Sequence, residues 1–342
     1  LAPTTTLETF LNKGFLSLAV VALDPSKGDE LKRGEMLFEY ALNIDSTSPR
    51  AILGMAVVMA HKREWAKALA LFRHVLARAA PAAPRGGVRL RGLNKIRFAM
   101  ATCFVGLARF DQTRNALGAI VAADPRDVEA LCALAHMEAK IATDGVGRSM
   151  ECLDEAVNVD KDHPVVLLQL ANHAFYCGME EDGADGANGE NASDGHSQAT
   201  PPWELAETLL QKVLKTSRSK HVRGEAHYQL GRLRHARQVY DEAYEEYKRC
   251  RELEPEHSAC LHGFAQSCVQ LGRMAEASGA LEDLRKSEGD STEVLRLLTF
   301  VYLHSGKRQK QAADAADALV KLDPEDMEGW VMRAEAHEQL AA

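Results

Sequence analysis

The stretch Gly231–Pro255 reads GRLRHARQVYDEAYEEYKRCRELEP, and it decides the fold. Five residues follow Gly231 at offsets of 9, 12, 16, 19 and 24, namely Tyr240, Ala243, Tyr247, Cys250 and Pro255. Small and large apolar residues thus alternate at spacings that place them on one face of a helix. A proline cannot continue a helix. The stretch therefore predicts a hairpin of two antiparallel helices, packed closely at Gly231 and ended by Pro255.

The same pattern recurs along the chain. Offset 9 from a small residue falls on Trp65, Phe110 and Met274 in other parts of the sequence. The small residues, called landmarks below, are Ala56, Ala101, Ala135, Ala171, Gly231, Ala265, Thr299 and Ala334, and several of them are 34 residues apart. A 34-residue period with this residue order is the tetratricopeptide (TPR) signature. It predicts an all-α fold, a right-handed superhelical solenoid of about eight hairpins over 7–340, with an unpaired last helix at Met327–Leu340.

Two longer steps between landmarks locate insertions. The step from Ala56 to Ala101 leaves room for an inserted loop at 80–92. The step from Ala171 to Gly231 leaves room for a second insertion at 179–202, which reads MEEDGADGANGENASDGHSQATPP. This run is acidic and has almost no apolar residues, so it cannot bury enough surface to offset the entropy of ordering. We expect the second insertion to be disordered and helix formation to resume at Trp203.

Composition limits the possible functions. The net charge of −8 argues against nonspecific nucleic-acid binding, and the two basic stretches, around 85–97 and 215–223, are interpreted as solvated faces. The seven cysteines show no C-x-x-C spacing, which favours buried, reduced thiols in an intracellular protein. No run of 18 apolar residues predicts a membrane span. Because the first residue is Leu1 and not Met, we expect the chain to be part of a longer protein.

Catalytic and metal-binding motifs are absent from the sequence. It contains no H-E-x-x-H, no phosphate-binding glycine loop and no G-x-S-x-G turn. We therefore expect no catalytic residue, no metal and no cofactor.

The landmarks also predict a binding surface. The first helix of each hairpin, called helix A, lines the inner wall of a TPR superhelix, and offsets of −3, +1 and +4 from its landmark should face the groove. Applied to four landmarks, this gives Phe98, Thr102, Val105, Leu168, Asn172, Phe175, Tyr228, Arg232, His235, Arg296, Phe300 and Leu303, with Tyr176 beside Phe175. Aromatic and aliphatic groups mixed with Arg, Asn and His suit a peptide ligand. The alternative for each residue is packing against the neighbouring helix A.

Five segments occur in a consistent order from about Glu35 to the end, and two of them, at 170–176 and 225–231, exceed what the generic repeat requires. They are CFVGLARF (103–110), LANHAFY (170–176), EAHYQLG (225–231), DEAYEEY (241–247) and PEDMEGW (324–330). Together they resemble the Ctr-nine family, the TPR scaffold subunit of the Paf complex of transcription elongation. The two insertions depart from that family, in which these loops are short, and the family's long helix and charged tail are missing here.

The resemblance implies a nuclear, non-enzymatic scaffold. It implies that the partners are the Paf subunit and the WD40 subunit of that complex, and the RNA polymerase II elongation complex. It also implies a role in elongation and in co-transcriptional histone modification. From the net charge and the lack of a long apolar run, we expect no direct sequence-specific nucleic-acid binding and no membrane. Two alternatives stay open: another TPR adaptor such as a chaperone-tail receptor, and the substrate-recognition arm of a TPR enzyme.

Overall fold

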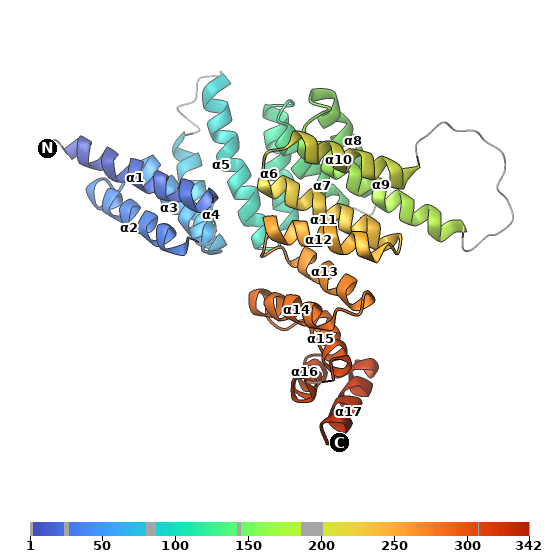
Figure 1. Cartoon of the computed structure of the whole chain (residues 1–342). Coiled ribbons are helices and arrows are strands. Elements are labelled where there is room, and N and C mark those ends of the chain that lie inside the picture. Colours follow the sequence, from blue (N-terminus) through green and yellow to red (C-terminus); the bar gives the residue numbers. More distant parts are fainter. Residues whose placement is uncertain are drawn as a thin grey trace, which may run out of the picture. The chain divides into compact units, whose positions relative to one another are not determined.

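A computed structural model describes residues 3–23, 27–79, 87–141, 145–185, 201–306 and 308–341. Over these ranges the chain forms seventeen α-helices and no strand, so the predicted all-α solenoid of helical hairpins is confirmed. The helices form eight consecutive hairpins followed by one unpaired helix (Figure 1). None of the described helices is both long enough and apolar enough to cross a membrane. The chain divides into two compact units, 1–161 and 162–342, which are described separately below.

The first unit holds four hairpins. Its helices are α1 (Pro3–Leu23), α2 (Gly28–Ile44), α3 (Pro49–His61), α4 (Trp65–Ala79), α5 (Gly87–Gly106), α6 (Phe110–Ala123), α7 (Val128–Ile141) and α8 (Gly145–Val159). Each helix packs on the next, and the core runs between the layers as successive hydrophobic clusters. Phe38 of α2 is fully buried between Gly14 of α1 and Gly54 of α3. One aromatic ring thereby joins its own hairpin to the following one.

The second unit holds four hairpins and the last helix. Its helices are α9 (Pro164–Asp185), α10 (Pro202–Thr216), α11 (Lys220–Ala236), α12 (Tyr240–Leu253), α13 (Ser258–Gln270), α14 (Met274–Glu288), α15 (Thr292–His304), α16 (Gln309–Leu322) and α17 (Met327–Ala341). In α12, Ala243, Tyr244, Tyr247 and Cys250 form the buried face. Acidic residues in its first turn and Arg251 in its last complement the helix dipole. Tyr247 repeats the arrangement of Phe38, since its ring lies against both Gly231 and Gly263.

Polar bridges also join successive hairpins of the second unit. His235 of α11 is hydrogen-bonded to Ser267 of α13 at 3.2 Å. The Tyr244 hydroxyl of α12 donates to Glu276 of α14 at 2.8 Å. The Arg251 guanidinium donates to Asp283, also on α14, at 3.2 Å. In each bridge the two residues are 32 positions apart, so equivalent helices are tied together in both layers.

The landmarks lie where the repeat pattern requires. Seven of them are buried: Ala56, Ala101, Ala135, Ala171, Gly231, Ala265 and Thr299. Offset 9 begins the second helix of a hairpin at Trp65, Phe110, Tyr240 and Met274, as the spacing predicts. Ala334 is exposed because α17 has no second helix of its own hairpin among the described residues.

Five hairpin turns share one backbone geometry. The residue seven positions after the landmark has positive φ in each: Arg63, Ala108, Gln238, Gly272 and Gly306. In four of the turns the next residue donates its N–H to the carbonyl five positions earlier, for example Val239 to Arg234 at 2.9 Å. This is the Schellman arrangement, which satisfies carbonyls left free at the end of a helix. Three of the five turns place a residue with a side chain where glycine is preferred.

Helices extend into both predicted insertions, and the insertions themselves stay a prediction. Helix α9 continues to Asp185, so the first seven residues of the 179–202 insertion are helical. Met, Glu and Ala favour helix there, and extending an existing helix avoids the cost of nucleation. Helix α5 begins at Gly87, so only 80–86 of the 80–92 loop lies outside a helix. Residues 80–86 and 186–200 fall outside the described ranges, and Trp203 lies in the first turn of α10, as predicted.

Candidate functional site

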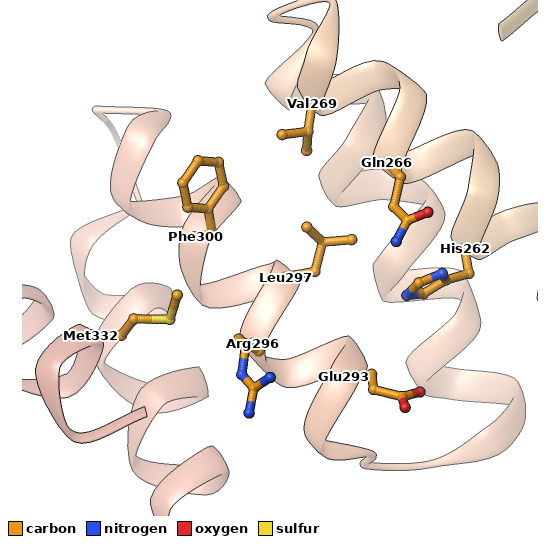
Figure 2. A pocket seen from close by; sticks show the side chains of 8 residues that line it. All are labelled: His262, Gln266, Val269, Glu293, Arg296, Leu297, Phe300 and Met332. Carbon is orange, nitrogen blue, oxygen red and sulfur yellow. The ribbon is translucent and has the colours of Figure 1, made fainter. Parts of the chain in front are cut away.

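The candidate site is a groove along the A helices of the second unit. One cavity of about 540 Å³ lies between α13, α15 and α17. Three helices supply its lining, as Figure 2 shows: His262, Gln266 and Val269 from α13, Glu293, Arg296, Leu297 and Phe300 from α15, and Met332 from α17. Spacings of three, four and seven residues put the residues of each helix on one face.

A second cavity of about 500 Å³ continues the first toward α11. It is lined by Tyr228 and Arg232 of α11 and by Tyr247 of α12. His262, Gln266 and Glu293 line both cavities, so the two form one continuous surface. We call this surface the A-helix groove.

One end of the A-helix groove is apolar. Val269, Leu297, Phe300 and Met332 are half-buried there and pack on the hydrophobic cluster beneath them. In Figure 2 the side chains of Leu297, Phe300 and Val269 surround the same hollow. A pocket of this kind suits an aliphatic or aromatic side chain of a ligand.

Arg296 is neutralised within the protein. Its guanidinium donates to the Asp326 carboxylate at 2.7 Å, and Glu328 lies 3.8 Å away. The hydrogen bond to Asp326 raises the pKa of Arg296 and lowers that of Asp326. Arg296 therefore contributes more to the shape of the groove than to its charge.

Arg232 has a different environment, built mainly from aromatic rings. Its guanidinium carbon lies 4.0 Å from the ring centre of Phe175, 5.2 Å from that of Tyr176 and 5.9 Å from that of Tyr228. One terminal nitrogen donates to the Asn172 side-chain oxygen at 3.1 Å. Its Nε is buried and has no hydrogen-bond partner among the described residues. Helix α9 thus orients a cation carried by α11.

His235 is half-buried beside α13. Burial, and after it the charge of His262, lowers the pKa of His235. The neutral imidazole is therefore favoured at this point of the repeat.

The structure places eleven of the thirteen predicted groove residues in four groups. Asn172, Phe175, Tyr176, Tyr228 and Arg232 are brought together, Arg296 and Phe300 line the first cavity, and His235 bonds to Ser267. Phe98, Thr102 and Val105 lie on α5 of the first unit, where Thr102 donates to the Phe98 carbonyl at 3.1 Å. Binding by these eleven residues stays a prediction.

The last two predicted groove residues are leucines, and binding by them also stays a prediction. Leu168 and Leu303 are buried, 6% and 7% exposed, and belong to hydrophobic clusters. At these two positions the offsets point into the packing layer and not into the groove. Both leucines therefore contribute to the core.

Several lining residues were not predicted from the sequence. His262, Gln266 and Val269 stand at offsets −3, +1 and +4 from Ala265, so the same rule extended to that landmark would have found them. Leu297 and Met332 stand two residues before their landmarks, and the rule does not reach them. Within the described ranges no group of three or more His, Cys, Asp and Glu residues converges as a metal site.

Comparison with known proteins agrees with this architecture. A tetratricopeptide-repeat family model matches residues 235–299. The sequence is 22% identical over 269 residues to "RNA polymerase-associated protein CTR9" of Caenorhabditis elegans, covering 78% of this chain and 20% of that protein. It is 24% identical over 330 residues to "Protein CTR9 homolog" of Arabidopsis thaliana, covering 95% of this chain and 26% of that protein. The chain thus spans about a quarter or less of the length of these relatives.

Solved structures show the same fold. A chain of the crystal structure of the APC/C hetero-tetramer Cut9-Hcn1 superposes with a TM-score of 0.58 at 13% identity, and the match covers 90% of this chain and 52% of that one. PilF of Pseudomonas aeruginosa superposes with a TM-score of 0.54 at 15% identity, and the match covers 72% of this chain and 99% of PilF. At these identities the similarity concerns the fold alone.

Proposed function

Since this chain is a Ctr9-like TPR protein, we propose that it is a non-enzymatic, protein-binding scaffold associated with RNA polymerase. The A-helix groove is the observation that carries the proposal. It joins a half-buried apolar pocket to a row of polar side chains along three A helices. Such a surface binds an extended or helical segment through apolar anchors and a few orienting hydrogen bonds.

The finer assignment is the Paf complex. The proposed partners are the Paf subunit and the WD40 subunit, and the proposed setting is RNA polymerase II elongation with co-transcriptional histone modification in the nucleus. Support comes from the ordered set of family-like segments and from the two CTR9 relatives.

Direct binding tests this proposal. The chain, purified with an affinity tag, is mixed with purified Paf subunit or WD40 subunit, and complex formation is measured by titration calorimetry and gel filtration. We expect a stable complex with at least one of them. If neither binds, and an acidic C-terminal peptide of the chaperone-tail type binds instead, the scaffold assignment is wrong and the chain is a chaperone-tail receptor.

A matched pair of leucines tests whether the groove is the binding surface. Leu297 lines the first cavity, whereas Leu322 is exposed at the end of α16 and lines neither cavity. Leu297→Ala should weaken binding at least about tenfold, because one buried leucine side chain is worth about 1.5–3 kcal/mol. Leu322→Ala should leave affinity unchanged. Equal effects of the two changes would place the interface elsewhere.

A further inference from the structure

The arginines of the second unit follow a pairing pattern. Nine of them lie within 4.0 Å of a carboxylate: Arg234, Arg237, Arg249, Arg251, Arg273, Arg285, Arg296, Arg308 and Arg333. Arg218 and Arg223 are exposed to solvent. Arg232 is half-buried, yet among the residues whose side chains the structure describes, which leaves out 180–185, no carboxylate forms an ion pair with it.

This arrangement leaves the guanidinium of Arg232 incompletely satisfied. Withdrawing a cation from water is unfavourable unless it gains charge or hydrogen-bond partners. The ring of Phe175 and the oxygen of Asn172 offset part of that cost. A guanidinium has five N–H donors, and Asn172 accepts from only one of its nitrogens. The remaining donors, including the buried Nε, are held in a fixed plane, and outside 180–185 no described side chain brings an anion to them.

The site is open to a ligand. Arg232 and Tyr228 line the second cavity of the A-helix groove, and Tyr176 beside them is 54% exposed. A group supplied by a partner can therefore reach the guanidinium without displacing the protein core. A carboxylate matches the planar, forked geometry of arginine.

We propose that Arg232 binds the carboxylate of an Asp or Glu side chain within a partner peptide. An apolar side chain of the same peptide occupies the adjacent cavity, among Leu297, Phe300 and Met332. The inference rests on the proposed function, because it assumes that the groove receives a partner. It adds the chemistry of that partner: an internal acidic residue next to an apolar anchor.

A carboxylate is favoured over a phosphate by the charges of the same cavity. Glu288 and Glu293 also line it. Two nearby carboxylates repel a phosphate, with its charge of about −1.5 to −2, more strongly than they repel a single carboxylate.

The experiment selects peptides without reference to any named partner. A library of random dodecapeptides displayed on phage, which present no free C-terminal carboxylate, is selected on the whole purified chain and, in parallel, on Arg232→Gln. We expect Asp or Glu beside an aliphatic or aromatic residue among the peptides enriched on the unchanged chain. That acidic preference should vanish on Arg232→Gln. Enrichment without an acidic residue, or no enrichment at all, would overturn the inference.

Synthetic peptides make the test quantitative. Each selected peptide is capped at both ends and compared with its Glu→Gln version by titration calorimetry. The change should cost at least about tenfold in affinity on the unchanged chain and little on Arg232→Gln. Equal losses on both proteins would mean that the acid binds elsewhere. A version with phosphoserine in place of Glu should bind more weakly, and tighter binding would overturn the assignment to a carboxylate.

Two further variants separate a loss of binding from a loss of folding. Arg273→Gln is the matched control, because Arg273 also lies over a tyrosine ring, 4.3 Å from that of Tyr244, but lines neither cavity of the groove. It should bind the selected peptides normally. Arg232→Lys keeps the charge and should retain part of the preference for Glu over Gln, even if Arg232→Gln is poorly folded. The library is random and is not designed from Paf-complex sequences. Its result therefore tests the preference of Arg232 for an acidic residue, and does not depend on whether the Paf subunit or the WD40 subunit binds.

Discussion

The ring of Tyr247 occupies the space that a β-carbon on Gly263 would need, with Cζ only 2.5 Å from that position. Tyr247 is 2% exposed, so its ring has no free space to move into. We expect Gly263→Ala to lower the free energy of unfolding by about 1–3 kcal/mol, as overpacking of a core does. Urea titration followed by circular dichroism measures the change.

Gly279 provides the control for this substitution. It lies inside α14, and among the described residues no neighbouring atom comes within 4 Å of the place that a β-carbon would take there. Gly279→Ala should leave stability unchanged or raise it by up to about 1 kcal/mol, through helix propensity. Similar losses at both glycines would contradict the close packing of Tyr247 on Gly263.

The hairpin turns predict a stabilising change. Gln238 has a φ of 60°, a conformation that costs a residue with a side chain about 1–2 kcal/mol. Gln238→Gly removes that cost. Glycine also increases the conformational entropy of the unfolded chain, which lowers the stability of the fold by about 0.4–1 kcal/mol. The net expectation is a gain of about 0.5–1 kcal/mol, seen as a higher midpoint in urea. The reverse change, Gly272→Ala at a φ of 70°, should destabilise, and a gain there would refute the strain argument.

His235 predicts a loss of stability on mild acidification. Burial, followed by the charge of His262, lowers its pKa below the ordinary value of 6.5. The unfolded chain therefore binds this proton more readily than the folded chain, so stability is complete above pH 6.5 and falls as the pH drops through the folded pKa. Thermal unfolding at about pH 7.5 and about pH 5.5, on either side of the ordinary histidine pKa, should show a smaller difference for His235→Gln than for the unchanged chain. The exposed His74 serves as control, and His74→Gln should keep the full difference.

A buried carboxylate in the first unit predicts an asymmetric response to mutation. Glu138 is 5% exposed and forms an ion pair with Arg114 at 2.5 Å. Arg114→Met leaves the Glu138 charge with Arg148, 3.9 Å away, and should cost about 1–3 kcal/mol. Adding Glu138→Gln should restore part of that loss. Arg126 lies at an exposed turn, so Arg126→Met should change the free energy of unfolding by no more than about 0.5 kcal/mol. A loss there as large as that of Arg114→Met would contradict a specific role for the ion pair between Arg114 and Glu138.

The sequence pattern was sufficient for the hairpins because packing repeats with the period. Landmarks such as Ala56 and Ala265 are buried for the same reason in every repeat, since two helices meet there. The turns were harder to predict, because Arg63, Ala108 and Gln238 adopt positive φ without the glycine that would signal it. There, the closing hydrogen bonds and the fixed helices determine the backbone.

The site was predicted less completely, for a physical reason. Groove positions differ between repeats in how closely the neighbouring helix A approaches, which buries Leu303 but leaves Phe300 half-exposed. The environment of Arg232 is built by Phe175 and Asn172, some sixty residues earlier in the chain, so no local pattern carries it. Contacts of this range depend on how the repeats stack.

The bridges from His235 to Ser267, from Tyr244 to Glu276 and from Arg251 to Asp283 have a mechanical consequence. A pulling force along the second unit passes through every interface between hairpins in turn, so the weakest interface limits the load that the whole array can bear. Between the hairpins α11–α12 and α13–α14 the load is divided over bridges in both helix layers. The two hairpins are therefore held together on the side of their first helices and on the side of their second helices. Under tension this pair of hairpins should therefore extend as one elastic block.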